Sequence, residues 1–461
     1  MGAGNLVGRG NQAHLRLDRG TGAAQTRKRT SGGVGVTAGR LYQYCDFKSD
    51  ARTERVRTRL LFLNRSFWPD PEATGQFLTE LCDDLSAQHR ITVIAGPSLH
   101  SGASHVPSLR RMLTWERRGE IKIVRTWGTR FSKTRLAGRL TNLATYYMLA
   151  ALAAQRIERP DIIIAETDPP LLGALGAALK QRFGCRLVYN VRDLYPDIAY
   201  ANRALKNSAL LTLLTRANSF AYRHADEVVT LGHDMAERII AKGVRASKVS
   251  VIPDWVDTNL IQPVSRNPFR TQFGERFVVM YSGNIGLSQH LEAVLEAAAR
   301  VASQPAIIFA LIGEGARKPA LMKHARERGL TNVVFLPYRP KEELAESLGA
   351  ADLHLIPLMR GAAGCLVPSK IYGILAAGRP FVAMMEADAE VARIACEDRI
   401  GFVVEPGDSV ALADTILSAN RNRNELRAMG ERGREVALRR FDRTVATGAF
   451  AAMLERVGRS G

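Results

Sequence analysis

The chain has 461 residues, more than a single hydrophobic core usually supports, and this length predicts two domains. Its composition, with 46% apolar and 24% charged residues, is that of a globular protein, and no apolar run is long enough to span a bilayer. The net charge of +19 indicates an anionic partner, unless it reflects only a high-GC genome that favours arginine. The five scattered cysteines form no CxxC pair, which argues against a disulfide framework or structural zinc and fits a reducing cytosol.

Residues 1–56 are rich in glycine and arginine and show no sustained apolar period. This composition predicts a disordered basic extension. A transit peptide, a basic nucleic-acid arm and a mis-assigned start codon are alternative origins for it, and the last is favoured. The stretch GGVGVTAGR has closely spaced glycines but follows no strand, so it is not a dinucleotide-binding fingerprint.

From Arg59 onward, short apolar runs alternate with helix-length amphipathic segments. Near-continuous apolar strands separated by helices predict a parallel sheet covered on both faces. The pattern runs through the first half, ends near residues 249–260 and then restarts. The predicted strands are 59–64, 91–96, 121–127, 161–166, 186–193, 227–232, 277–286, 306–315, 332–338, 353–358, 380–385 and 401–408. The predicted fold class is therefore α/β, with two doubly wound Rossmann-like domains that face each other across a cleft.

Three loops that follow strands in the second half contain the small residues that close ligand approach requires. They are SGNIG (282–286), GEG (313–315) and GAAGCLVPSK (361–370). Each precedes a helix, so each presents backbone N–H groups and the positive end of a helix dipole to an anion. Three such loops at one end of a sheet predict a phosphorylated ligand. The alternative is that they are ordinary turn glycines.

Lys370 lies in the first turn of the helix after the third loop, where the dipole disfavours a cation by roughly 0.3–1 kcal/mol. Pro368 suits the first helical position, because its missing N–H is not needed there. A diphosphate held by the amides around Leu366 and Val367, with Lys370 as its counter-charge, explains this arrangement. The alternative is a solvated lysine that the fold tolerates.

Seven motifs in a characteristic order carry a resemblance to a known family. They are FWPDPEATGQFLTEL after the first strand, NVRDLYPD (190–197), VIPDWVD (251–257), YSGNIG, LIGEG, FLPYRPKEEL and VPSKIYGILAAGRP. From about Arg59 to Arg440 the chain resembles the family-4 glycosyltransferases of the GT-B fold. Within them it is similar to the bacterial branch that builds O-antigen and capsule sugars and includes N-acetyl-L-fucosamine transferases.

Composition, strand pattern and resemblance together predict four parts along the chain. After the extension (1–56) come an N-terminal Rossmann-like acceptor domain (57–262) and a C-terminal Rossmann-like nucleotide-sugar-binding domain (263–440), and a C-terminal helix (441–461) braces the domains. The resemblance also implies retention of anomeric configuration without a bound metal, cofactor or protein nucleophile. The acceptor hydroxyl attacks on the leaving-group face and the departing phosphate takes its proton. This agrees with the lack of a DxD motif at a strand end and of HExxH.

The resemblance also assigns roles to individual residues. The predicted catalytic residues are Asp193, at a strand end where relatives place a contact to the donor sugar, and Lys370. For Asp193 the alternative is a helix cap or turn residue, and for Gly75 it is a helix-start glycine. The other residues predicted to bind the nucleotide-sugar are Gly75, Gly283, Asn284, Gly286, Gly313, Glu314, Gly315, Pro337, Tyr338, Gly364, Leu366, Val367 and Ser369.

Two departures from the family pattern concern donor recognition. Many relatives carry a Glu-x7-Glu pair whose second member holds the ribose hydroxyls, but here Gly373 fills that place and Cys365 the earlier one. The phosphate-binding lysine that many relatives have after SGNIG is also absent. Glu390, which opens the helix DAEVARI, is predicted to replace the ribose ligand. The alternative is that an acid there only complements the dipole of its own helix.

Residues 110–139 are dense in arginine and lysine, with Trp115, Trp127 and Phe131 interleaved. A basic surface with interfacial aromatics is typical of peripheral proteins on anionic lipid. The alternatives are a solvated face with core tryptophans, or a nucleic-acid patch.

Together these features predict a cytoplasmic glycosyltransferase, peripheral on the inner face of the membrane, that uses a nucleotide diphosphate sugar, with UDP favoured. Its partners would be this donor, a lipid-linked or other saccharide acceptor in surface polysaccharide biosynthesis and an anionic membrane, but not nucleic acid. One alternative is a non-hydrolysing UDP-N-acetylglucosamine 2-epimerase, which would need carboxylates and histidines in the cleft. The others are a non-catalytic binding protein derived from a transferase and, more distantly, a nucleic-acid-binding protein.

Overall fold

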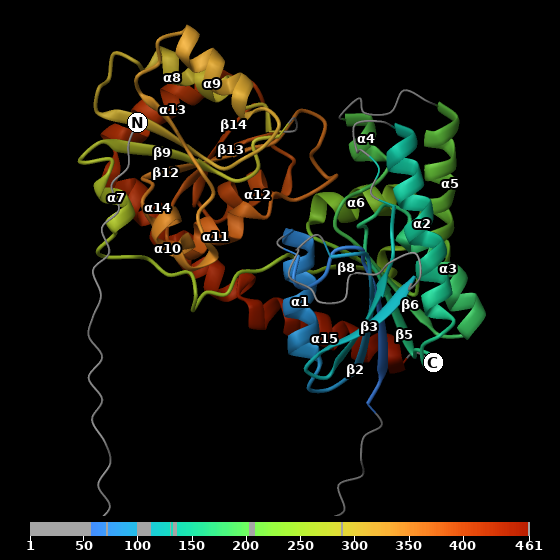
Figure 1. Cartoon of the computed structure of the whole chain (residues 1–461). Helices are drawn as coiled ribbons and strands as arrows, with labels where there is room; N and C mark the ends of the chain where they lie inside the picture. The colour runs from blue at the N-terminus through green and yellow to red at the C-terminus, as the bar shows by residue number, and fades with distance from the viewer. Residues whose placement is uncertain are drawn as a thin grey trace, which may run out of the picture. The chain divides into compact units, whose positions relative to one another are not determined.

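The computed structural model describes residues 57–70, 72–98, 112–129, 131, 136–201, 208–286 and 289–459 (Figure 1). The disorder predicted for residues 1–56 lies outside this range, as does part of the basic segment 110–139. The chain beyond Arg55 forms one compact unit that contains two β-sheets.

The first sheet has eight strands in the order β3-β4-β2-β1-β5-β6-β7-β8. All its strand pairs are parallel except β3 with β4. The strands are β1 (Arg59–Leu63), β2 (Arg90–Ala95), β3 (Leu113–Arg118), β4 (Ile121–Thr126), β5 (Ile162–Ala165), β6 (Arg186–Val191), β7 (Glu227–Thr230) and β8 (Val249–Val251). β3 was not predicted, because this edge strand alternates polar and apolar residues instead of forming an apolar run.

The second sheet has six parallel strands in the order β11-β10-β9-β12-β13-β14. They are β9 (Phe277–Ser282), β10 (Ile307–Ile312), β11 (Val333–Leu336), β12 (Leu353–Pro357), β13 (Phe381–Met384) and β14 (Gly401–Val404). Each lies within one of the apolar runs that predicted it. The order reverses at β9, so β9 and β12 flank the switch point of a doubly wound fold.

Helices cover both faces of each sheet. In the first half they are α1 (Ala73–Leu85), α2 (Leu136–Ala154), α3 (Leu172–Phe183), α4 (Asp197–Ala201), α5 (Ser208–His224), α6 (His233–Ala241) and the 3-10 turn η1 (Ala246–Lys248). In the second they are α7 (Pro268–Thr271), α8 (Glu292–Arg300), α9 (Lys318–Glu327), η3 (Lys341–Glu343), α10 (Leu344–Gly349), α11 (Lys370–Ala376), α12 (Glu390–Glu397), α13 (Ser409–Arg421), α14 (Arg423–Val436) and the π-helical turn η4 (Ala437–Phe441). The last helix is α15 (Arg443–Arg459).

Strand β1 shows why the apolar runs are continuous. Leu61 and Leu63 pack on one face with Tyr146 of α2, whereas Leu60 and Phe62 pack on the other with α1 and α15. Because successive side chains of a strand point to opposite faces, a sheet buried on both sides needs apolar residues at every position. The predicted fold class, two Rossmann-like α/β domains, is confirmed.

Helix α15 returns the chain to the first sheet. Phe450, Met453 and Leu454 share a core with Leu60 and Phe62 of β1. Two backbone hydrogen bonds fix the start of this helix beside residue 256. The Val256 N–H donates to Phe441 O at 2.9 Å, and the Arg443 N–H donates to Val256 O at 3.0 Å. The C-terminal helix therefore contributes to the core of the first half. The domain limits predicted from the sequence stay predictions.

Candidate functional site

The loops after β9 and β10 carry two of the three glycine motifs, and they pack directly on each other. The Ile285 N–H donates to Glu314 O at 2.8 Å, which continues the strand pairing beyond the sheet. Gly313 has φ +144°, and a Cβ there would lie 1.9 Å from Gly283 O. No other residue fits Gly313, because both its backbone conformation and the contact with backbone exclude a side chain.

Lys370 is the first residue of α11 and points toward the loop after β9. Its Nζ donates to the Tyr281 hydroxyl at 3.1 Å and lies 4.2 Å from the centre of that ring. The Tyr281 hydroxyl in turn donates to Asn284 O at 2.5 Å. A Cβ on Gly283 would lie 3.2 Å from Nζ. The lysine is therefore held against the SGNIG loop.

The charge of Lys370 has no counter-ion in the described part of the chain. Among the residues described, no carboxylate oxygen lies within 4.0 Å of its Nζ. Burial lowers the pKa of Lys370 to about 7, because the charged form loses solvation without gaining an ion pair. A partly buried cation at a helix N-terminus, between glycine-rich loops, is an electrostatic arrangement that an anion would complete.

The loop after β6 meets the loop before α11. Asp193 and Leu366 form an antiparallel bridge, and the Leu194 N–H donates to Cys365 O at 2.7 Å. Burial raises the pKa of Asp193 to about 6, although the charge of Arg192 opposes this shift. The structure thus brings Asp193 beside the segment that contains Gly364, Leu366, Val367 and Ser369.

Exposure differs among three other predicted residues, Glu314, Tyr338 and Gly75. Glu314 and Tyr338 are exposed, and the Glu314 carboxylate accepts a hydrogen bond from Lys318 Nζ at 2.6 Å. Gly75 is buried in the first turn of α1, where a Cβ would lie 3.3 Å from the Ser66 carbonyl carbon. This position agrees with the alternative given above, in which Gly75 is a helix-start glycine.

Glu390 makes contacts that the sequence did not suggest. Its carboxylate accepts the backbone N–H of His233 at 2.8 Å, and its second oxygen lies 3.1 Å from His233 Nδ1. A ribose ligand would have to share this carboxylate with His233. At Gly373, an added Cβ would lie 3.1 Å from Leu348 Cδ1, so a leucine side chain limits the space at that position.

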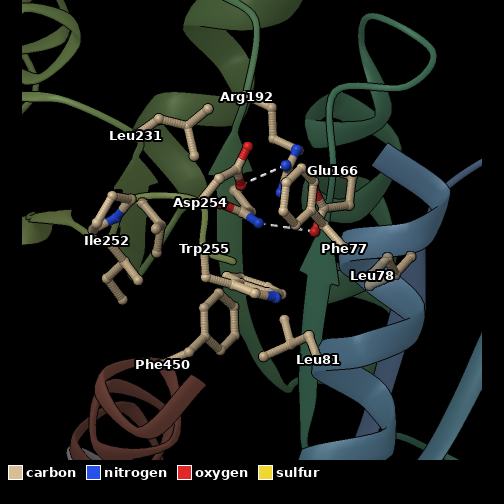
Figure 2. A pocket seen from close by; sticks show the side chains of 13 residues that line it. Phe77, Leu78, Leu81, Glu166, Arg192, Leu231, Ile252, Asp254, Trp255 and Phe450 are labelled. Carbon is tan, nitrogen blue, oxygen red and sulfur yellow. Dashed lines mark hydrogen bonds and ion pairs between the residues drawn. The ribbon is translucent and has the colours of Figure 1, made fainter. Parts of the chain in front are cut away.

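A buried polar cluster lies at the carboxyl ends of β5 and β6 (Figure 2). Arg192 forms an ion pair with Asp254 and lies 4.9 Å over the ring of Phe77. Glu166 accepts a hydrogen bond from Asn190 at 2.8 Å, while its other oxygen has no partner among the residues that the structure describes. Burial raises the pKa of Glu166 to about 7. The free space beside these groups, about 10 Å³, holds at most one water.

The sequence missed this cluster because its members come from separate strands. One local signal was available, since a glutamate directly after the apolar strand β5 is unusual unless its carboxylate has a polar neighbour. Within the described ranges, no three of His, Cys, Asp and Glu gather in a way that would hold a metal ion.

Two Rossmann-like sheets with these loops at their strand ends define the GT-B class of protein. The chain belongs to the glycosyltransferase family, with residues 72–255 matching the glycosyl transferase 4-like domain and residues 265–436 the glycosyl transferases group 1 domain.

Two bacterial relatives support this assignment. The chain is 30% identical to an Escherichia coli K12 protein named colanic acid biosynthesis glycosyl transferase WcaI, over 78% of this chain and 92% of the relative. It is 31% identical to a Pseudomonas aeruginosa protein named glycosyltransferase WbjE, over 70% of this chain and 82% of that protein.

Solved structures show the same fold. Anabaena HepE in complex with UDP superposes with a TM-score of 0.65 at 19% identity, covering 87% of this chain and all of HepE. WaaG, a glycosyltransferase involved in lipopolysaccharide biosynthesis, gives 0.62 at 15% identity, covering 85% of this chain and 98% of WaaG. The predicted GT-B fold and glycosyltransferase family are therefore confirmed, and the transferase interpretation is favoured over the epimerase and non-catalytic alternatives.

Proposed function

We propose that the protein is a retaining, metal-independent glycosyltransferase that moves a sugar from a nucleotide diphosphate, with UDP favoured, to a lipid-linked or other saccharide acceptor. The observation that carries this proposal is Lys370, a partly buried cation that lies between the SGNIG loop and the start of α11 and has no counter-ion among the described residues. The UDP bound by HepE and the colanic acid role in the name of WcaI support a nucleotide-sugar donor and surface polysaccharide biosynthesis. Membership of the branch that includes N-acetyl-L-fucosamine transferases remains a prediction.

In the proposed reaction, the bond between the sugar and the diphosphate breaks while the acceptor oxygen bonds to the same face of the sugar. The acceptor proton passes to the departing diphosphate. Lys370 and the amides around Leu366 would stabilise the charge that develops on the leaving group, and a single well-placed donor of this kind is worth about 3–4 kcal/mol. Asp193, beside Leu366, would position the sugar.

Thermal shift assays of the full chain with UDP, GDP and their sugars, with and without magnesium, test the proposal. We expect a rise in Tm with UDP and UDP-sugars that does not depend on magnesium. No stabilisation by any nucleotide would refute the transferase proposal. Metal-dependent stabilisation would refute only the metal-independent mechanism. NMR of the product then shows whether the anomeric configuration is retained.

We also propose that one face of the first sheet contacts an anionic membrane. Trp115 of β3 is 53% exposed, Phe131 is 56% exposed and Met148 of α2 is 67% exposed. Trp115 pairs with Val124, which packs beneath α2, so Trp115 and α2 lie on the same face of the sheet. None of the helices in the described part of the chain is long and apolar enough to cross a bilayer.

Vesicle sedimentation tests this membrane contact. We expect binding to vesicles with anionic lipid that weakens with salt, and little binding to neutral vesicles. The double variant Trp115→Ser, Met148→Ser should lose binding, whereas Leu438→Ser, an exposed apolar residue of η4, serves as the control. Equal binding to neutral vesicles, or no loss in the double variant, would contradict the proposal.

A further inference from the structure

Two helices that follow strands of different sheets cap each other at their N-termini. Helix α6 follows β7 of the first sheet, and α12 follows β13 of the second. Asp234, in the first turn of α6, accepts the backbone N–H of Glu390 at 2.9 Å. Glu390, the first residue of α12, accepts the backbone N–H of His233 at 2.8 Å. Each carboxylate therefore binds a free N–H group at the start of the other helix.

The pair is buried and closely fitted. Asp234 and Glu390 are each 7% exposed. At Gly232, an added Cβ would lie 2.8 Å from both Asp234 Oδ1 and Glu390 Cγ, so a side chain there would displace one of the two acidic side chains. Buried carboxylates are stable only where donors satisfy them, and here backbone N–H groups do so. The two halves of the chain are thus joined by hydrogen bonds and not only by apolar contact.

Asp234 also holds the loop before Lys370. The same oxygen that accepts the Glu390 N–H accepts the Gly364 N–H at 3.0 Å. One turn further along α6, Arg238 packs against Gly364, where a Cβ would lie 2.6 Å from the arginine Nε. Gly364 has φ +67°, a conformation that disfavours other residues. Helix α6 of the first half therefore fixes the position of the backbone at Gly364. From there the chain continues to the predicted phosphate site of the second half.

We propose that Asp234 is a positioning residue for donor binding, which fixes the loop from Gly364 to Lys370 and couples it to the first half through the reciprocal cap with Glu390. This inference rests on the proposed function, because the loop is taken to bind the donor diphosphate. Asp234 itself does not touch the donor. Its effect is to hold the Gly364 N–H, and with it the path of the backbone that leads to Leu366 and Lys370.

The test compares Asp234→Ala with Asp234→Asn by calorimetric titration of UDP-sugar. The alanine variant should bind at least about tenfold more weakly, because a buried N–H loses its acceptor and the loop is released. The asparagine variant keeps an acceptor oxygen and should recover most of the affinity. Asp408→Ala is the matched control, since Asp408 caps α13 through the N–H groups of Val410 and Ala411, at 3.1 and 2.9 Å.

The control separates positioning from stability. Both alanine variants should lower Tm, but only Asp234→Ala should weaken donor binding. Equal donor affinity in wild type and Asp234→Ala would overturn the inference. If Asp234→Ala does not fold, Asp234→Ser replaces it, because a shorter polar side chain no longer reaches the Gly364 N–H and should still weaken donor binding about tenfold. A wild-type protein that binds no nucleotide would instead refute the proposed function.

Discussion

The replacement of Lys370 by methionine tests the electrostatic basis of the site. Methionine keeps a similar length over the Tyr281 ring but carries no charge. The pKa of Lys370 is lower in the folded chain, at about 7, than its ordinary value of 10.5. The unfolded chain therefore binds the proton more tightly between these values, and wild-type stability should rise with pH across that window by up to about 1.4 kcal/mol per pH unit. In Lys370→Met this rise should be absent.

The same substitution should weaken donor binding. A charge-assisted hydrogen bond contributes about 1.5–3 kcal/mol, so Lys370→Met should bind UDP-sugar about 10- to 100-fold more weakly at pH 6.5. Uridine, which lacks the diphosphate, should bind wild type and variant equally. Because the diphosphate favours the charged lysine, wild-type affinity should fall by up to about tenfold per pH unit above pH 7. The affinity of Lys370→Met should not change with pH in this range.

Calorimetry with a nucleotide sugar measures both effects, since its diphosphate has no group that titrates near neutral pH. At pH 8 in buffers of different ionisation enthalpy, wild type should take up a proton on binding. Lys180→Met is the control, because Lys180 of α3 pairs with Asp226 at 2.6 Å in the first half. It should lose stability and keep its donor affinity. An equal loss of UDP and uridine binding in Lys370→Met, or a wild-type affinity that is the same at pH 6.5 and 8.5, would refute the placement of Lys370 on the diphosphate.

Three further predictions concern single side chains. Burial raises the pKa of Glu166 to about 7 from its usual 4.5, so the folded chain holds that proton more tightly and the free energy of unfolding should fall as pH rises through this window. In urea unfolding at pH 5.5 and 7.5, wild type should lose more stability than Glu166→Gln, by up to about 1.4 kcal/mol per pH unit. Gly313→Ala should lower Tm and abolish the UDP shift, because its Cβ would meet Gly283 O at 1.9 Å, and a normal UDP shift would contradict this. Gly448 is exposed in the interior of α15, and a Cβ added there would have no contact within 4 Å among the described residues outside its own helix. Gly448→Ala should therefore stabilise the protein by about 0.5–1 kcal/mol, and an unchanged Tm would count against this prediction.

The strands and the glycine loops were predictable because their signals are local. A run such as RLLFL indicates a strand buried on both faces. Closely spaced glycines after a strand indicate a backbone that must approach another group. The unusual place of Lys370 was visible for a similar reason, since a cation in the first turn of a helix conflicts with the dipole of that helix. Its role in binding the donor stays a prediction. The edge strand β3 was not, because its partly exposed residues follow no apolar run.

The sequence by itself therefore determined two Rossmann-like sheets and the loops at their strand ends. Only the tertiary structure decided which groups meet there. Glu390 complements a helix N-terminus, as the sequence suggested, but the carboxylate caps α6 through His233, 157 residues away in the chain. Asp234 in turn reaches Gly364 and Glu390, 130 and 156 residues away. Local periodicity fixes a strand or a helix, whereas a hydrogen bond between distant residues depends on how two sheets pack, which no short stretch of sequence encodes.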